Sequence, residues 1–140
     1  MSVDCVPARA FASAQLDRHW KKVTKLGKHL NELDEREWHR LRKRIKSLRY
    51  TADFFAGMFG PEAARRTVRR LGALQDSFGA LNDLVTAERL VMELSRGRPE
   101  IEEAGRAVIA VHRQLAEAVA EEAGRQWRKF ARIEPFWRGT

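Results

Sequence analysis

The chain has 140 residues, 44% of them hydrophobic and 33% charged, and its net charge is +8 at neutral pH. This length suits one domain over residues 1–140, and it is enough to bury a core without disulfides. The surplus of positive charge favours an anionic partner, which can be nucleic acid, an acidic membrane or another polyanion.

Cys5 is the only cysteine, so no disulfide can form within the chain, and we expect a reducing, cytoplasmic setting. No apolar run approaches the roughly 18 residues that span a bilayer. The first residues also lack the basic start and apolar stretch of a signal peptide. We therefore expect no membrane partner.

Helical periodicity runs through nearly the whole chain, and no segment alternates with the period of two that a strand requires. We predict an all-α protein with four long helices in an antiparallel bundle. Within about 2–4 residues at each end, the expected helices span residues 8–32, 35–58, 61–95 and 99–131.

The first predicted helix separates apolar from basic side chains. Its apolar side comprises Leu16, Trp20, Val23, Leu26 and Leu30. The opposite side carries candidate contacts for an anion, namely Arg18, Lys21, Lys22, Lys25 and Lys28. This arrangement predicts one buried face and one basic face.

The second predicted helix begins with a capping signal, because Asp34 can accept from the backbone at Glu37 while Glu37 reaches back. Intervals of four and three residues predict a buried stripe of Leu41, Ile45, Leu48, Ala52 and Phe55. The other side of the helix gathers the main candidate binding residues, His39, Arg42, Lys43, Lys46 and Arg49. Lysine and arginine are the side chains that suit phosphate oxygens.

Residues 18–49 contain twelve Lys or Arg against four Asp or Glu, a surplus of +8 that equals the net charge of the whole chain. Two helices joined by a short turn lie antiparallel, so their basic faces would flank a common groove. The plainer interpretation is a solvated helix face that happens to be basic. Two matched faces and a surplus of a single sign favour the binding groove.

The third predicted helix contains a short echo, in which GALQD at 72–76 returns as GALND at 79–83. The spacing of seven places both copies on one face. Gly72 and Gly79 each cost about 1 kcal/mol of helix propensity relative to Ala, so we expect a neighbouring helix to approach closely there. A smaller basic cluster, RRTVRR, lies at 65–70.

The fourth predicted helix has mixed charge and ends in an aromatic cluster, FARIEPFW at 130–137. This cluster can pack onto the bundle or contact a partner. The chain has no CxxC, HExxH or GxxxxGK[ST] motif, so we predict no catalytic residue, no metal ligand and no cofactor.

Two segments, WHRLRKRIKSLRYTADFF at 38–55 and LGALQDSFGALNDL at 71–84, resemble the CHAD domain, the conserved histidine α-helical domain. The family pattern is a His, an Arg three residues later, a Lys or Arg at seven, and Arg-Tyr at ten and eleven. The matching residues are His39, Arg42, Lys46, Arg49 and Tyr50. The segment LDRHWKKVTKLGKHL at 16–30 also resembles the basic first helix of the family.

The resemblance implies a helical module, not an enzyme, that binds inorganic polyphosphate along a basic channel. Carried over by position, the lining would comprise His39, Arg42, Lys43, Lys46 and Arg49, with Arg18, Lys22 and Lys25. A full CHAD domain has two pseudo-symmetric four-helix halves, and this chain resembles the C-terminal one. It would then be a fragment or a half-length protein, and a symmetric homodimer would rebuild the channel. Polyphosphate granules are a further partner that the resemblance suggests.

Three other functions compete with polyphosphate binding. Nucleic-acid binding is the main alternative, although the basic faces lack aromatic side chains placed to stack bases. A scaffold or granule-surface protein whose charge serves only solubility is another. A phosphohydrolase is the weakest, because no acidic metal cage can be inferred.

Overall fold

The computed structural model describes residues 5–138, and within them it contains helices and turns but no strand. The α-helices are α1 (Cys5–Gly27), α2 (Glu35–Phe55), α3 (Pro61–Ser95) and α4 (Pro99–Ala131). Short 3-10 helices lie on either side of α2, η1 (Leu30–Glu32) and η2 (Ala56–Met58). The predicted all-α class is confirmed. The main difference is that α1 ends at Gly27, earlier than the expected end near residue 32.

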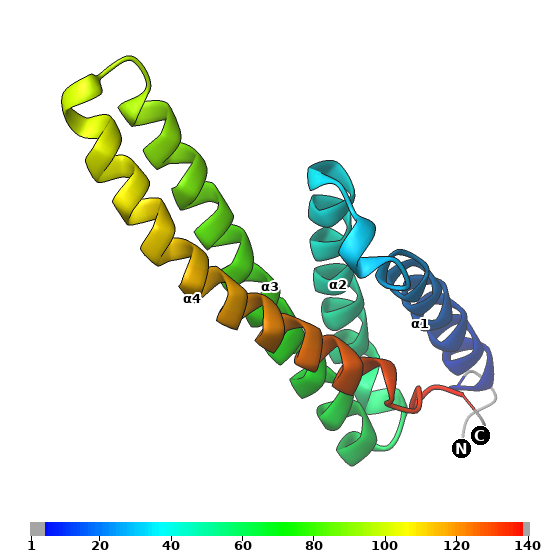
Figure 1. The fold of residues 1–140 in the computed structure, drawn as a ribbon. Helices are drawn as coiled ribbons and strands as arrows, with labels where there is room; N and C mark the ends of the chain where they lie inside the picture. Colours follow the sequence, from blue (N-terminus) through cyan, green and yellow to red (C-terminus); the bar gives the residue numbers. More distant parts are fainter. Residues whose placement is uncertain (1–4, 139–140) are drawn as a thin grey trace.

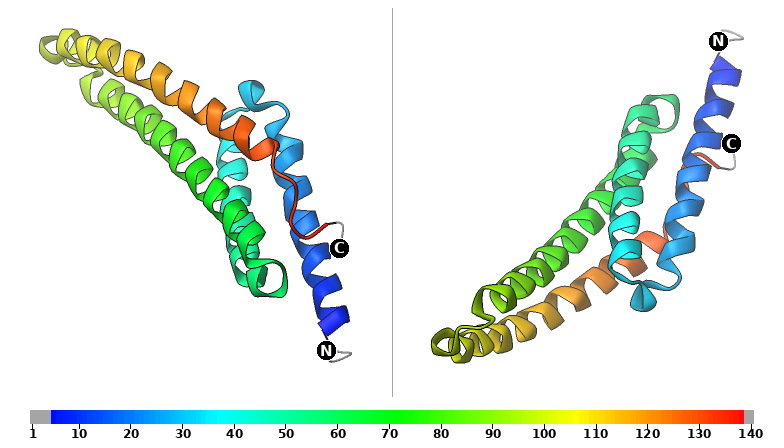
Figure 2. Two further views of the ribbon diagram at one scale, coloured as in Figure 1. Left: turned by 90° about the horizontal axis from the view of Figure 1, so that it is seen from below. Right: turned by 90° about the horizontal axis from the view of Figure 1, so that it is seen from above.

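The helices pack in chain order, α1 on α2, α2 on α3 and α3 on α4 (Figure 1). With 35 and 33 residues, α3 and α4 form a hairpin that extends beyond the other helices. Its closed end, around residues 96–98, stands clear of α1 and α2 (Figures 1 and 2). We call residues 80–118 the arm, and the remaining described residues the base.

The core lies in the base, where all four helices contribute buried side chains. The predicted stripe of α2 is confirmed, because Leu41, Ile45, Leu48 and Ala52 are buried and Phe55 packs against them. The other helices add Leu16, Trp20 and Val23 from α1, Leu71, Leu74 and Phe78 from α3, and Ala123 and Phe130 from α4. The apolar face of α1 is also confirmed, with Leu26 partly buried near its end, and Leu30 is partly buried in η1.

The capping box at the start of α2 is present as predicted. The backbone N–H of Glu37 donates to Oδ1 of Asp34 at 2.8 Å, and the Asp34 N–H donates to Oε1 of Glu37 at 3.3 Å. Leu33 and Trp38, on either side of this box, pack against the core. A cap of this kind stabilises a helix by about 1 kcal/mol, and here it sets the residue at which the basic face of α2 begins.

The C-terminal aromatic cluster packs onto the bundle, which decides between the two alternatives that its sequence left open. Trp20 of α1 lies 4.9 Å from Phe130 and 5.7 Å from Trp137, measured between ring centroids. The Ser13 hydroxyl donates to the carbonyl oxygen of Trp137 at 3.1 Å. The cluster therefore ties the end of α4 to α1, two segments that are far apart in the sequence.

Asp17 of α1 holds the same C-terminal segment through polar contacts. Nε of Arg138 donates to its Oδ1 at 2.7 Å, and Nε1 of Trp137 donates to the same oxygen at 3.3 Å. Nζ of Lys21 lies 3.1 Å from the other carboxylate oxygen. Burial alone would raise the pKa of Asp17, but the hydrogen bonds from these side chains outweigh it and the pKa lies below its usual value.

Candidate anion-binding site

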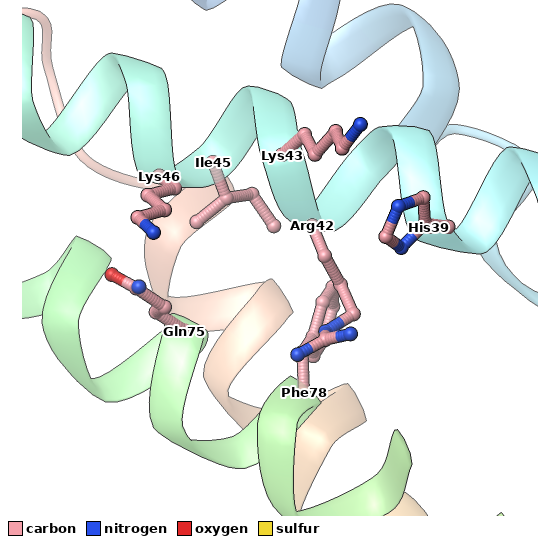
Figure 3. A pocket seen from close by; sticks show the side chains of 7 residues that line it. All are labelled: His39, Arg42, Lys43, Ile45, Lys46, Gln75 and Phe78. Carbon is pink, nitrogen blue, oxygen red and sulfur yellow. The ribbon is translucent and has the colours of Figure 1, made fainter. Parts of the chain in front are cut away.

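The basic face of α2 borders a cavity of about 280 Å³ between α2 and α3 (Figure 3). The lining residues are His39, Arg42, Lys43, Ile45, Lys46, Gln75 and Phe78. Arg42 reaches from α2 toward α3 beside Phe78, and Lys46 and Gln75 point toward one another across the cavity (Figure 3). The structure thus brings four of the five α2 candidates together with two residues of α3.

The floor of the cavity is apolar and firmly packed. Ile45 and Phe78 are fully buried. The Phe78 ring stacks on Trp38 with 4.6 Å between centroids, and on its other neighbour, Trp127, at 6.5 Å. A buried floor lowers the local dielectric, so an anion above it interacts more strongly with the surrounding lysine and arginine side chains than it would in open water.

The two glycines of the echo leave room for two arginines of α2. A Cβ added at Gly72 would lie 3.5 Å from Cζ of Arg49, and one added at Gly79 would lie 4.0 Å from Nη2 of Arg42. Arg42 and Arg49 are seven residues apart on α2, and Gly72 and Gly79 are seven residues apart on α3. Because the two helices are antiparallel, a single register accounts for both contacts. The expected close approach of a helix backbone is therefore not what the glycines meet: guanidinium groups lie against them at ordinary contact distance.

Arg49 is the α2 candidate that lies just outside the cavity lining. Its Nη1 donates to Oε1 of Gln75 at 2.9 Å, which holds the side chain along α3. Because the amide of Gln75 is neutral, this bond orients the guanidinium without cancelling its charge. Sequence reasoning noted Gln75 as part of the echo but did not predict its role in the site.

Within residues 5–138, the structure shows no ion pair for Arg42, Lys43, Lys46 or Arg49. The Nζ of Lys46 instead lies 5.8 Å from the ring centroid of Tyr50, a distance at which cation and ring attract one another. No Asp or Glu is among the lining residues of the cavity. The site is therefore a set of cations whose charge remains available to an anionic ligand.

The candidates on α1, and Lys28 just after its end, are exposed, and they are not among the residues that line this cavity. Lys21 pairs with Asp17, and Nη2 of Arg18 donates to Oε1 of Gln15 at 2.8 Å. Lys28 lines a different cavity, of about 330 Å³, together with Trp127 and other residues. The second wall of the basic cavity is thus α3, whereas the sequence had suggested a groove between the first two helices.

The basic side chains of α1 also act on a histidine of the same helix. Partial burial, together with the positive charges of Arg18 and Lys22, lowers the pKa of His19. Lys22 and Lys25 lie exposed on the same helix. This face therefore extends the positive surface of the base beyond the α2–α3 cavity.

Sequence reasoning also missed a second cationic cavity, of about 620 Å³, between the start of α3 and the end of α4. Its bases are Arg66, Arg70, Lys129 and Arg132, and its one acidic lining residue is Glu134. The signal on α3 was the RRTVRR cluster, but the partners on α4 are more than fifty residues away in the sequence.

Among the described residues, no three His, Cys, Asp or Glu side chains are placed to hold a metal ion. In the same part of the chain, no helix combines the length and the apolar character needed to cross a bilayer.

Comparison with known proteins identifies the family of the chain. A family model described as the CHAD domain matches residues 3–92, which include both walls of the α2–α3 cavity. No curated protein and no solved structure matches the chain. The matched residues are more than half of the sequence, and they contain the motif around His39 that suggested the resemblance. The chain therefore belongs to the CHAD-domain family.

Proposed function

We propose that this protein binds inorganic polyphosphate, without catalysing a reaction, at the α2–α3 cavity. CHAD domains are in general associated with polyphosphate binding. The observation that carries the proposal is the rim of Arg42, Lys46 and Arg49, whose cations have no acidic partner among the described residues. Fixed cations beside an apolar floor suit a ligand that is a string of negative charges.

The length of the basic row favours a chain of phosphates over a single phosphate. Arg42 and Arg49 are seven residues apart, which corresponds to about 10 Å along the helix axis. A polymer that runs along α2 would contact the whole row, whereas a single phosphate would contact only part of it. Arginine forks and the mobile lysine head both donate to phosphate oxygens, and such charge-assisted bonds are the stronger kind.

The absence of acidic residues from the cavity lining supports binding rather than catalysis. A phosphoryl-transfer site uses a carboxylate to orient or activate the nucleophile, and often further carboxylates to hold metal ions. The role we propose for His39 is therefore to donate a hydrogen bond to phosphate. The expected setting is cytoplasmic, where the protein would meet polyphosphate as free chains or at the surface of granules.

Nucleic-acid binding is a second candidate that one observation favours. Tyr50 and Phe54 are 60% and 82% exposed, so aromatic rings do lie beside the basic row, contrary to the expectation from the sequence. Tyr50 directly follows Arg49, and Phe54 lies about one turn further along α2. The bases of single-stranded nucleic acids stack on exposed aromatic rings that lie beside basic side chains. Polyphosphate has no rings to stack, so these two side chains separate the candidates.

A competition titration tests the proposal. Labelled long-chain polyphosphate is bound to the full chain, and single-stranded DNA, double-stranded DNA or ATP is added at equal phosphate concentration. We expect only unlabelled polyphosphate to displace the probe efficiently. Preferential displacement by single-stranded DNA, lost in a Tyr50→Ala/Phe54→Ala variant, would support the nucleic-acid candidate instead.

We also propose that the protein acts as a symmetric homodimer. The two walls of the cavity, α2 and α3, leave the ligand open to solvent on one side, and a full CHAD domain supplies a second, pseudo-symmetric half. Two copies related by a two-fold axis would give a polyanion a second set of cations.

A further inference from the structure

The arm exposes apolar side chains to an extent that the base does not. The large exposed residues on α3 and α4 within the arm include Leu90, Leu94, Val108, Val111 and Leu115. Val111 is 69% and Leu94 is 63% exposed. Single exposed apolar residues are common, so the arrangement of these residues decides whether they form an interaction surface.

One seam of α4 already has a partner in α3. Its partly or fully buried positions in the arm follow intervals of three and four residues, at Glu102, Gly105, Ile109, His112 and Ala116. A Cβ added at Gly105 would lie 3.1 Å from Oγ of Ser95, so the two helices approach closely here. The hairpin is thus an antiparallel pair packed along a heptad-like seam.

A second seam of α4 repeats the same spacing but faces solvent. Its members are Ile101, Ala104, Val108, Val111, Leu115 and Ala118, all of them apolar and, in the structure, all exposed. A solvent-facing helix side normally carries polar residues, and a helix with two apolar seams normally packs against two partners. In this structure α3 covers only the first seam.

The helix α3 extends this apolar face on its own side. Its partly buried positions in the arm include Leu81, Leu84, Glu88, Val91 and Ser95, again at intervals of three and four residues. The residues just before them are Ala80, Asp83, Ala87, Leu90 and Leu94, four of them apolar and one acidic. The exposed seam of α4 likewise contains the residues just before its core positions. In an antiparallel pair such positions lie on the same side of the hairpin, so the two helices form one face that is apolar except for Asp83 near the base.

The charge of the arm also differs from that of the base. Residues 80–118 contain five Lys or Arg against seven Asp or Glu, whereas residues 18–49 carry a surplus of +8. Without a polyanion to neutralise them, two copies of the base would repel one another strongly, whereas two arms, each with a net charge of −2, would repel only weakly. A second copy of the chain can therefore approach through the arm.

We propose that the apolar face of the arm docks a second copy of this chain, so that two arms form an antiparallel four-helix bundle around a two-fold axis. A symmetric dimer uses the same patch twice, and a mainly apolar face is complementary to itself. The combination of two antiparallel helix pairs is a stable and common packing arrangement.

The size of the face fits such a contact. The seam from Ile101 to Ala118 extends over about 27 Å of helix, and two helices each about 10 Å across give a footprint of about 500 Å² per copy. The corrugation of interlocking side chains adds to this accessible area. The total approaches the range of roughly 600–1,000 Å² per partner that specific interfaces bury.

Sedimentation velocity of the full chain at high micromolar concentration tests this proposal. We expect the wild type to have the mass of two protomers. Val111→Glu should weaken the dimer by more than about a hundredfold, because the dimer would bury an unpaired carboxylate. The matched control is Met92→Glu, which should remain dimeric. Met92 is 51% exposed, and it directly follows the partly buried Val91, whereas the residues of the apolar face directly precede such positions, so it lies on the opposite side of the arm.

Circular dichroism of each variant shows that its helices are retained, which is expected because both substituted side chains are exposed. A wild type with the mass of one protomer at high concentration would overturn the proposal, as would equal dissociation of both variants. The result is independent of polyphosphate. The Arg42→Ala/Lys46→Ala/Arg49→Ala variant should keep the mass of two protomers whether or not the wild type binds the anion.

Discussion

The base and the arm of this molecule are made of the same kind of helix, but they use their surfaces differently. In the base, all four helices contribute side chains to the buried core, and α1 and α2 each expose a row of basic residues. In the arm, two helices cover one seam, and apolar side chains of the second seam remain exposed. The charge surplus of +8 falls entirely within residues 18–49 of the base. Charge and apolar surface are thus separated along the molecule, which suits an anion at one end and a protein partner at the other.

The largest effect is expected from removing the basic row of the base. The triple variant Arg42→Ala/Lys46→Ala/Arg49→Ala should bind long-chain polyphosphate more than about a hundredfold more weakly, because each lost charged donor costs on the order of 1–3 kcal/mol. Fluorescence titration against labelled polyphosphate measures the change. The slope of affinity against salt concentration should also become shallower, because fewer counterions are released.

The matched control for the triple variant removes the same charge from the arm, by Arg96→Ala, Arg98→Ala and Arg106→Ala. We expect a loss of binding several times smaller, since only the general attraction of net charge is reduced. Equal losses in the two triple variants would mean that the row on α2 is only a solvated basic face.

The next largest effect concerns the stability of the base. Gly27 at the end of α1 lies against the ring of Trp127, and an added Cβ would overlap that ring. Gly27→Ala should therefore lower the free energy of unfolding by about 1–3 kcal/mol, the usual cost of forcing extra atoms into a packed site. Urea denaturation followed by tryptophan fluorescence measures it. Gly57→Ala is the control, because nothing lies within 4 Å of a Cβ added there.

A smaller effect, with a pH signature, is expected at Asp17. Asp17→Asn should cost about 1–2 kcal/mol, because it weakens the contacts to Trp137 and Arg138. The folded-state pKa of Asp17 is lowered, so its contribution is present above its usual value near 3.8 and is lost as the pH falls through the folded value. The stability difference between wild type and variant should therefore disappear in strong acid. A difference that stayed constant from neutral pH to strong acid would contradict the assigned role of the carboxylate.

The smallest effect is expected at the glycines of the echo. A methyl group at Gly79 meets only Nη2 of Arg42, at 4.0 Å, which leaves ordinary room. Gly79→Ala should therefore stabilise α3 by up to about 1 kcal/mol through helix propensity and leave polyphosphate binding unchanged. Gly79→Leu, by contrast, should displace Arg42 and weaken binding. A thermal melt and the same titration check both variants, and weaker binding by Gly79→Ala would show that the guanidinium needs closer contact than the structure gives.

Much of the fold could be predicted from the sequence because the relevant signals are local. The box of Asp34 and Glu37, the prolines at the starts of α3 and α4, and the stripe of Leu41, Ile45 and Leu48 each depend on residues a few positions apart. The basic face of α2 followed from the same periodicity. These features are properties of single helices, and they did not require knowledge of what each helix packs against.

The tertiary structure decided which helix lies beside each face. It placed α3 rather than α1 across the basic cavity, set Arg49 and Arg42 against Gly72 and Gly79, and folded Trp137 onto α1. The sequence of α4 contains two apolar seams, but whether a seam is covered depends on the position of the other helices. Periodicity gives the direction in which a side chain points along its own helix. The neighbour that it meets is set by contacts between residues far apart in the chain, and those contacts arise only when the whole core packs together.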